Sequence, residues 1–326
     1  MADQPLVSII TPAYQAEKTI GAAISSCLSQ TYPNIEIVVT NDGSTDRTGD
    51  IAHAHGVKVI DQENHGLSHA RNQAIAASSG DLLFLCDSDD ILLPPAIEAV
   101  VANYNEHGPG KRLVTSQAYF LTPGGVSHRR LQFPMQHPKP EDQRMALQHT
   151  NWLSIFTLFP RALIDEVGGF DEELRQVEDW DMWLRAVFAG YTVSRQPKPH
   201  CMYRWFGNSL STQRETMYAT EDRVLTAHRD RESAKGNLRP PEREYLDRRL
   251  RDGSPRRLID EAEMALRVDD FRLAKEKFDA ALRLAPSNRK LQVRAHSIKI
   301  PGMARLWAQR QRRIDAQVGW NDEMRR

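Results

Sequence analysis

Three short polar segments in the first ninety residues directly follow apolar runs, and they contain residue types suited to bind a metal ion and phosphate. The segments are residues 11–14 (TPAY), 41–46 (NDGSTD) and 87–90 (DSDD). If the apolar runs are neighbouring parallel strands, these segments meet at the carboxyl edge of the sheet, where such sheets bind ligands. The sequence therefore predicts a single site built from distant parts of the chain.

Asp87 and Asp89 lie two positions apart, directly after the apolar run DLLFLC. In an irregular turn, carboxylates at this spacing reach one hard cation and leave its other positions to water and phosphate oxygens, as Mg²⁺ or Mn²⁺ prefers. Such an ion neutralises a departing diphosphate. The alternative is that Asp89 or Asp90 caps the next helix. The location at a strand end favours a cation site.

Two further acidic positions suit specific roles. Asp42 can accept the imide N–H of a uracil, a donor that cytosine lacks, or it can form an Asx-turn before Gly43. Glu178 and Asp179 open a predicted helix, where the helix dipole favours an ionised carboxylate that can act as a general base toward a hydroxyl. Acidic residues are also typical of the first turn of any helix.

The segments that must position these residues alternate between strand and helix patterns. Apolar residues that recur on one face of a predicted helix are Ile20, Ala23, Ile24, Cys27 and Leu28. This alternation predicts an α/β fold with a mostly parallel sheet covered on both faces. Strands are predicted at residues 7–11, 35–40, 57–60 and 81–86, with helices at 45–55 and 67–77.

The pattern then becomes mixed. A hairpin of residues 112–121 and 126–133 is predicted, followed by helices at 160–167 and 178–189 and closing strands at 191–194 and 201–205. Trp180 lies on the apolar face of the helix 178–189. A position on this face usually packs in the core.

The charge distribution predicts two domains, 1–220 and 221–326. The first holds 17 Lys+Arg and 25 Asp+Glu, whereas the second holds 26 and 18 and is helical in pattern. Residues 255–297 resemble a tetratricopeptide helix pair, with Ala274, Phe278 and Ala281 at the repeat spacing. A single repeat cannot bury its own apolar face. The region therefore either docks a protein partner or supports the first domain.

Several classes are disfavoured by composition. No signal peptide or run of about 18 apolar residues is present, so a cytoplasmic protein is expected. Three distant cysteines argue against a disulfide framework or thiolate zinc site. The Arg-rich tail, residues 303–326, also permits a helix on the inner membrane surface. Basic residues are mixed with acidic ones, so nucleic acid is not a predicted partner.

Six ordered blocks resemble the family 2 glycosyltransferases of GT-A fold: VSIITPAYQAEKTI, NDGSTDRT, NHGLSHARNQAI, GDLLFLCDSDD, VGGFDEEL and VEDWDMWLR. The resemblance implies inverting transfer of a sugar from a nucleotide-sugar, most often a UDP-sugar, to a glycan, lipid-linked or protein acceptor. The alternative is a non-catalytic scaffold that binds a nucleotide-sugar and recruits partners through the helical region. A nucleotidyltransferase is disfavoured, because TPAYQAEKT is not a Gly-rich, Arg-containing loop.

The resemblance also implies individual roles. Asp179 would be the base, and Asp87 and Asp89 would bind the sugar, the diphosphate and a divalent cation, Mg²⁺ or Mn²⁺. Trp180 would either pack in the core or stack on the acceptor sugar. The residues implied to line the nucleotide pocket are Thr11, Pro12, Ala13, Tyr14, Asp42 and Arg71.

One segment departs from the family pattern. Many members have a histidine shortly after the last Tyr-Arg pair, but Tyr203 and Arg204 are followed by Trp205, and His200 precedes them. The cation is therefore expected to bind carboxylates, phosphates and water. Arg204 can reach the diphosphate or pair with a surface carboxylate.

Overall fold

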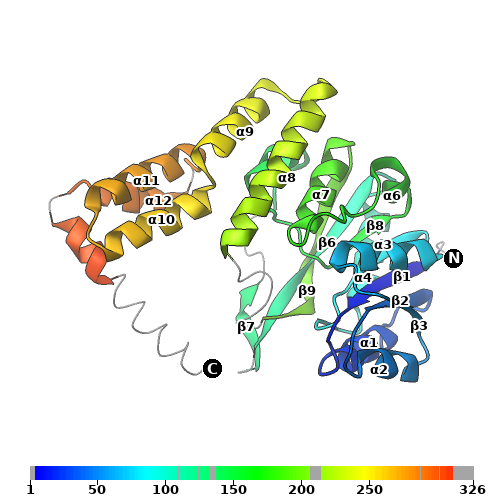
Figure 1. Ribbon diagram of the computed structural model, residues 1–326. Helices are drawn as coiled ribbons and strands as arrows, with labels where there is room; N and C mark the ends of the chain where they lie inside the picture. Colours follow the sequence, from blue (N-terminus) through cyan, green and yellow to red (C-terminus); the bar gives the residue numbers. More distant parts are fainter. Residues whose placement is uncertain are drawn as a thin grey trace. The chain divides into compact units, whose positions relative to one another are not determined.

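The chain forms two compact units, Met1–Gln213 and Arg214–Arg326 (Figure 1). The structure is a computed structural model that describes residues 4–108, 110–122, 125–131, 137–205, 214–286, 288–300 and 302–310. The division falls before the predicted boundary at residue 220, because the first helix of the second unit, α8, begins at Arg214.

A mixed sheet forms the centre of the first unit. Its strands are β1 (Val7–Ala13), β2 (Ile35–Asp42), β3 (Lys58–Gln62), β4 (Leu82–Leu85), β5 (Ile91–Leu92), β6 (Arg112–Thr122), β7 (Gly125–Leu131), β8 (Thr157–Pro160) and β9 (Thr192–Arg204). Their order is β3-β2-β1-β4-β8-β6-β9-β5, with β7 paired to β6. The strands β1 to β4 are parallel, and β8 runs antiparallel to both β4 and β6. The predicted α/β class is confirmed.

Helices cover both faces of this sheet. They are α1 (Ile20–Leu28), α2 (Thr48–Ala54), α3 (Leu67–Ala77), α4 (Ala96–Glu106), α5 (Gln143–His149), α6 (Ala162–Val167) and α7 (Glu178–Phe188), with a 3-10 turn at Pro140–Asp142. In Figure 1, α3 lies above strands β1 and β2, while α1 and α2 lie below them. Strands β1 and β4 are therefore buried along their whole length. Burial on both faces explains why their sequences are continuous apolar runs rather than alternating ones.

Two details of the predicted elements are wrong. The closing strands are a single strand, β9, which continues along β6 through a register shift between Ser116 and Ala118. Leu28 is 52% exposed, so it does not belong to the buried face of α1. It is the last residue of that helix, and the apolar face ends one residue earlier, at the buried Cys27.

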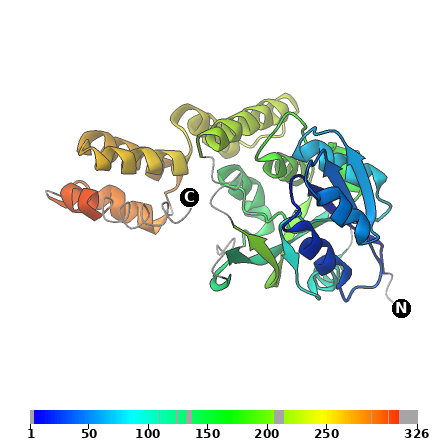
Figure 2. The ribbon, with the colours of Figure 1, turned by 60° about the horizontal axis from the view of Figure 1, so that its bottom comes forward.

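The second unit consists of helices. They are α8 (Arg214–Ala234), α9 (Pro240–Asp252), α10 (Pro255–Arg267), α11 (Phe271–Leu284) and α12 (Arg289–Ser297). Helices α10 to α12 lie side by side (Figure 2) and share one apolar core that includes Leu258, Phe278 and Leu291. The pair α10–α11 therefore buries its apolar face partly on α12. Its relation to the tetratricopeptide repeat remains a prediction.

Phe278 is buried at 2% exposure in the core that these helices share. Phe278→Ala is expected to reduce the local stability of this unit by about 3–5 kcal/mol, because it removes buried apolar surface and leaves a cavity. Native-state hydrogen exchange of amides in α10 to α12 measures this unit specifically. Met264→Ala is the control, since Met264 is 60% exposed. Equal protection in the two variants would contradict the assigned core.

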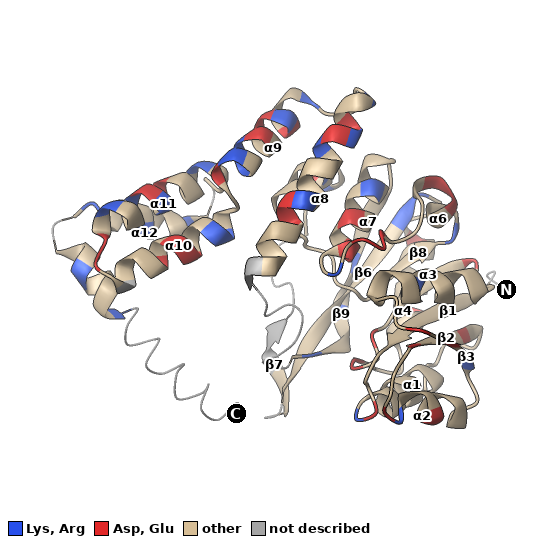
Figure 3. Cartoon of the chain, in the orientation of Figure 1, with Lys and Arg blue, Asp and Glu red and all other residues tan. Residues whose placement is uncertain are grey.

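None of the helices in the described ranges is long and apolar enough to cross a membrane. Residues 311–326 of the predicted membrane-surface tail lie outside the described residues. Basic and acidic side chains are interspersed along the helices α8 to α12 (Figure 3).

Candidate active site

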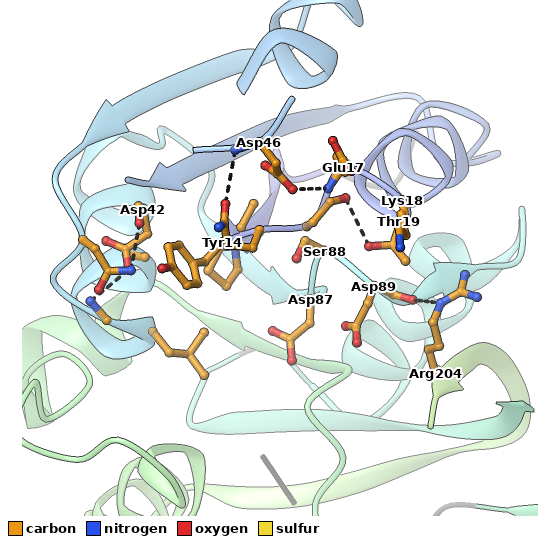
Figure 4. A pocket seen from close by; sticks show the side chains of 18 of the residues that line it. Tyr14, Glu17, Lys18, Thr19, Asp42, Asp46, Asp87, Ser88, Asp89 and Arg204 are labelled. Atoms are coloured by element: carbon orange, nitrogen blue, oxygen red, sulfur yellow. Dashed lines mark hydrogen bonds between the residues drawn. The ribbon is translucent and has the colours of Figure 1, made fainter. Parts of the chain in front are cut away.

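A cavity of about 950 Å³ is lined by all three of the predicted polar segments (Figure 4). Residues 12–19 enter it from the end of β1, Asp42 and Asp46 from the end of β2, and residues 87–89 from the turn after β4. These three strands are neighbours in the sheet and run parallel, so their carboxyl ends lie at one edge. The sheet topology therefore brings the three segments together at one cavity.

Asp87 and Asp89 lie side by side in this cavity (Figure 4). Burial and the neighbouring charge of Asp87 raise the pKa of Asp89 to about 6. Two crowded, partly desolvated carboxylates favour a cation between them. Within the described ranges, no three His, Cys, Asp or Glu side chains are grouped to hold a metal ion. The pair fits a divalent cation that takes its other ligands from phosphate and water.

Asp90 has a structural role in the same turn. It is fully buried, and its Oδ1 accepts a hydrogen bond from the backbone N–H of Arg204 at 2.8 Å. Burial and the charges of Asp89 and Asp87 raise its pKa well above the usual value. The next long helix, α4, begins at Ala96 after Pro95. Asp90 therefore binds the end of β9 through a hydrogen bond. The alternative prediction, that Asp89 or Asp90 caps the next helix, is wrong for α4.

Asp42 is buried at the wall of the cavity and organises the loop before α3. Its Oδ1 accepts hydrogen bonds from Gln62 Nε2 at 2.7 Å and from the N–H of His65 at 2.9 Å, and its Oδ2 accepts one from the N–H of Gly66 at 2.8 Å. The Asx-type contact in this turn comes from Asn41 instead, whose Oδ1 accepts the N–H of Ser44. Because a carboxylate has about four acceptor sites, Oδ2 retains capacity for a further donor.

The other predicted lining residues divide into two groups. Pro12, Ala13 and Tyr14 line the cavity, and Tyr14 is 54% exposed. Thr11 and Arg71 are buried and are not among the residues that line the cavity. Thr11 lies within β1, which extends to Ala13 rather than ending at residue 11.

Arg71 joins two parts of the site. Its side chain is 1% exposed, its Nη2 donates to Asp87 Oδ1 at 2.8 Å, and its Nη1 donates to Glu178. Burial alone would lower the pKa of Arg71, but the two carboxylates outweigh it and raise that pKa. The guanidinium is therefore a permanent buried charge between the turn after β4 and the first turn of α7.

Asp179 follows Glu178 on α7 and is not among the residues that line the cavity. Its Oδ2 accepts a hydrogen bond from Asn151 Nδ2 at 2.9 Å, and its Oδ1 accepts one from the N–H of Trp180 at 2.7 Å. Burial, followed by the charge of Glu178, raises the pKa of Asp179 to about 7. A carboxylate with this pKa can both accept and release a proton near neutrality.

Trp180 and Arg204 occupy different environments. Trp180 is buried, and its indole N–H donates to the carbonyl of Leu147 on α5 at 2.7 Å. It packs in the core, which corrects the alternative that it stacks on a sugar. Arg204 lines the cavity, and its Nε donates to the backbone carbonyl of Asp89 at 2.6 Å (Figure 4). This hydrogen bond stabilises the turn that contains Asp87 and Asp89.

Arg175 and Asn151 belong to this region although no sequence pattern indicated them. Arg175 lines the cavity, and its Nη1 lies so close to Gly66 that a Cβ there would be 2.6 Å away. Asn151 reaches Asp179 from the loop after α5. Neither belongs to one of the six blocks. Gly66 has a φ of 98°, a conformation that favours glycine, and the absence of a Cβ there leaves room for the side chain of Arg175.

The first unit of the chain is similar to known glycosyltransferases. Residues 8–167 match the family described as Glycosyl transferase family 2, so the predicted resemblance to that family is confirmed for this segment. An uncharacterized glycosyltransferase of Rickettsia typhi is 34% identical over 197 residues, covering 56% of this chain and 58% of that protein. The chain thus spans less than two thirds of that relative's length.

Two solved structures share the fold. S. aureus TarS 1-349 in complex with UDP-GlcNAc superposes with a TM-score of 0.60 at 17% identity, over 94% of this chain and 92% of that one. The mannosyltransferase PcManGT from Pyrobaculum calidifontis, in complex with GDP-Man and Mn²⁺, gives 0.55 at 17% identity, over 95% and 85%. The predicted GT-A fold with a helical C-terminal region is confirmed.

Proposed function

We propose that this protein is an inverting glycosyltransferase that moves a sugar from a nucleotide-diphospho-sugar to a glycan, lipid-linked or protein acceptor with the help of a divalent cation. One observation carries the proposal. A single cavity at the carboxyl edge of the sheet is lined by Tyr14, Asp42, Asp87 and Asp89, which are far apart in sequence. The match of residues 8–167 to the Glycosyl transferase family 2 supports the same activity.

The donor is proposed to be a UDP-sugar. Tyr14 offers an exposed ring for the base, and Asp42 Oδ2 can accept the imide N–H of uracil in addition to the N–H of Gly66. The UDP-GlcNAc bound to TarS and the GDP-Man bound to PcManGT support the wider class of nucleotide-diphospho-sugar donors, and only the first has the uridine base.

Asp87 and Asp89 are proposed to hold Mg²⁺ or Mn²⁺. When bound, the cation supplies positive charge to the diphosphate as it leaves. Arg204 keeps the turn in place through the carbonyl of Asp89. Because burial and the charge of Asp87 raise the pKa of Asp89 to about 6, a cation is expected to release a proton from Asp89 as it binds.

Asp179 is proposed to take the proton from the acceptor hydroxyl. Inversion needs one in-line displacement, so a single base on the acceptor side suffices and no covalent nucleophile is required. Asn151 and the N–H of Trp180 fix the orientation of its carboxylate. Its raised pKa gives it the proton affinity that general-base catalysis near pH 7 requires.

The test is incubation of the full chain with a panel of nucleotide-sugars, with Mn²⁺ or with EDTA, while nucleotide release is recorded. We expect release from UDP-sugars in Mn²⁺ and loss of release in EDTA. Binding of UDP without turnover of any donor, even with saccharide acceptors present, would support the scaffold alternative. Release from every donor regardless of EDTA would contradict the cation assignment.

A further inference from the structure

The buried guanidinium of Arg71 connects three elements that are distant in sequence. Arg71 comes from α3, its partner Asp87 from the turn after β4, and its partner Glu178 from the first turn of α7. Asp87 is 27% exposed and faces the cavity, whereas Glu178 is only 7% exposed. One end of this arrangement thus meets the donor cavity, and the other lies next to Asp179.

The chemistry of the guanidinium suits this connection. Arginine has a planar, permanently charged fork that can bind two carboxylates in fixed directions, whereas lysine presents a single point charge. The ring of Phe170 lies under the guanidinium, 5.4 Å from Cζ to the ring centroid. With both carboxylates bound and Phe170 packed against it, the side chain is held in one orientation.

We propose that Arg71 is a positioning residue that couples the two halves of the reaction, because one arm of its guanidinium fixes Asp87 at the donor and the other fixes Glu178 beside the base. The inference rests on the proposed function, since it concerns the same site. Arg71 is not among the residues that line the cavity, and its guanidinium donates hydrogen bonds to Asp87 and Glu178. It acts through its two carboxylate partners.

The coupling has an electrostatic consequence at Asp179. The charged groups around that carboxylate are Glu178 on the same helix and Arg71 from α3, with Asn151 as a neutral hydrogen-bond donor. The charge of Glu178 raises the pKa of Asp179, and that of Arg71 lowers it. Asp87 is linked to this group of charges through its ion pair with Arg71. Removal of the charge of Glu178 should therefore lower the pKa of Asp179, and removal of the charge of Arg71 should raise it.

The experiment compares the pH dependence of kcat/KM for Glu178→Gln, Arg71→Met and the wild-type chain with the preferred donor. The acid limb of the wild-type profile is expected near pH 7, the pKa of Asp179. It should move down by roughly one pH unit in Glu178→Gln and up by roughly one unit in Arg71→Met, as expected for the loss of one close charge. Arg71→Met should also lower kcat by about 10–100-fold, the usual cost of removing a group that orients a functional ligand.

A matched control comes from a second buried pair on the same helix. Arg185 Nε donates to Asp181 Oδ2 at 2.8 Å, with both side chains nearly buried. Asp181→Asn should reduce stability without moving the acid limb. Arg71→Lys restores the charge but not the fork, so its acid limb should return toward the wild-type position while kcat stays below the wild-type value.

The outcomes separate the two proposals. A wild-type chain that turns over no nucleotide-sugar defeats the proposed function. An active wild type whose acid limb stays fixed in Glu178→Gln, or moves the same way in Glu178→Gln and Arg71→Met, overturns the coupling role of Arg71. If Arg71→Met does not fold, the test is the comparison of Glu178→Gln with Asp181→Asn. Equal pH profiles of kcat/KM in those two variants would contradict the coupling role of Arg71.

Discussion

Asp179→Asn is expected to lower the rate of sugar transfer by about 10³-fold and to leave the affinity for UDP unchanged. The first effect follows because general-base catalysis contributes about 10²–10⁴-fold and an amide cannot accept the proton. The second follows because Asp179 is not among the residues that line the cavity. Single-turnover kinetics and calorimetric titration with UDP measure the two effects separately. Wild-type turnover in this variant would assign the base to another residue.

The same variant is expected to be more stable than the wild type at pH 8. Burial and the charge of Glu178 raise the pKa of Asp179 from 3.8 to about 7 in the folded state. A raised carboxylate pKa opposes ionisation in the folded chain, so stability falls as the pH rises from about 4 to about 7. The Tm advantage of Asp179→Asn should therefore grow between pH 5 and pH 7 and stay constant above it. An advantage that shrinks with rising pH would contradict the assigned environment of Asp179.

Asp89→Ala is expected to abolish the effect of Mn²⁺ on donor binding and to reduce transfer by at least about 10³-fold. Asp89 is proposed to share the cation site with Asp87, and one carboxylate would hold a divalent ion less tightly against water than the pair would. Loss of the cation also removes the charge that neutralises the diphosphate in the transition state. Titration of UDP-sugar with and without Mn²⁺ measures the first effect directly.

Asp81→Asn is the control for this variant. Asp81 directly precedes β4, so it lies at the opposite end of the strand from Asp87 and Asp89, and its side chain is exposed. The affinity of the Asp81→Asn variant for the UDP-sugar should depend on Mn²⁺ as fully as that of the wild type. A dependence on Mn²⁺ that persists in Asp89→Ala would place the cation elsewhere.

The sequence by itself determined the part of the site that lies at the strand ends. Continuous apolar runs alternate with helix patterns, and this alternation permits a parallel sheet with covered faces. In such a sheet the carboxyl ends of neighbouring strands meet whatever the details of packing. Asp42, Asp87 and Asp89 could therefore be predicted to share one cavity, and the structure brings them together there.

Only the tertiary structure decided the partners of the long and aromatic side chains. Arg71 was expected in the cavity, but its reach allows several directions, and the carboxylate of Glu178, 107 positions away, fixes one of them. Trp180 is buried because α5, which the sequence pattern did not indicate, supplies the carbonyl of Leu147. Periodicity is a local property of the chain, whereas the contacts of a flexible or bulky side chain depend on elements that pack against it from distant segments.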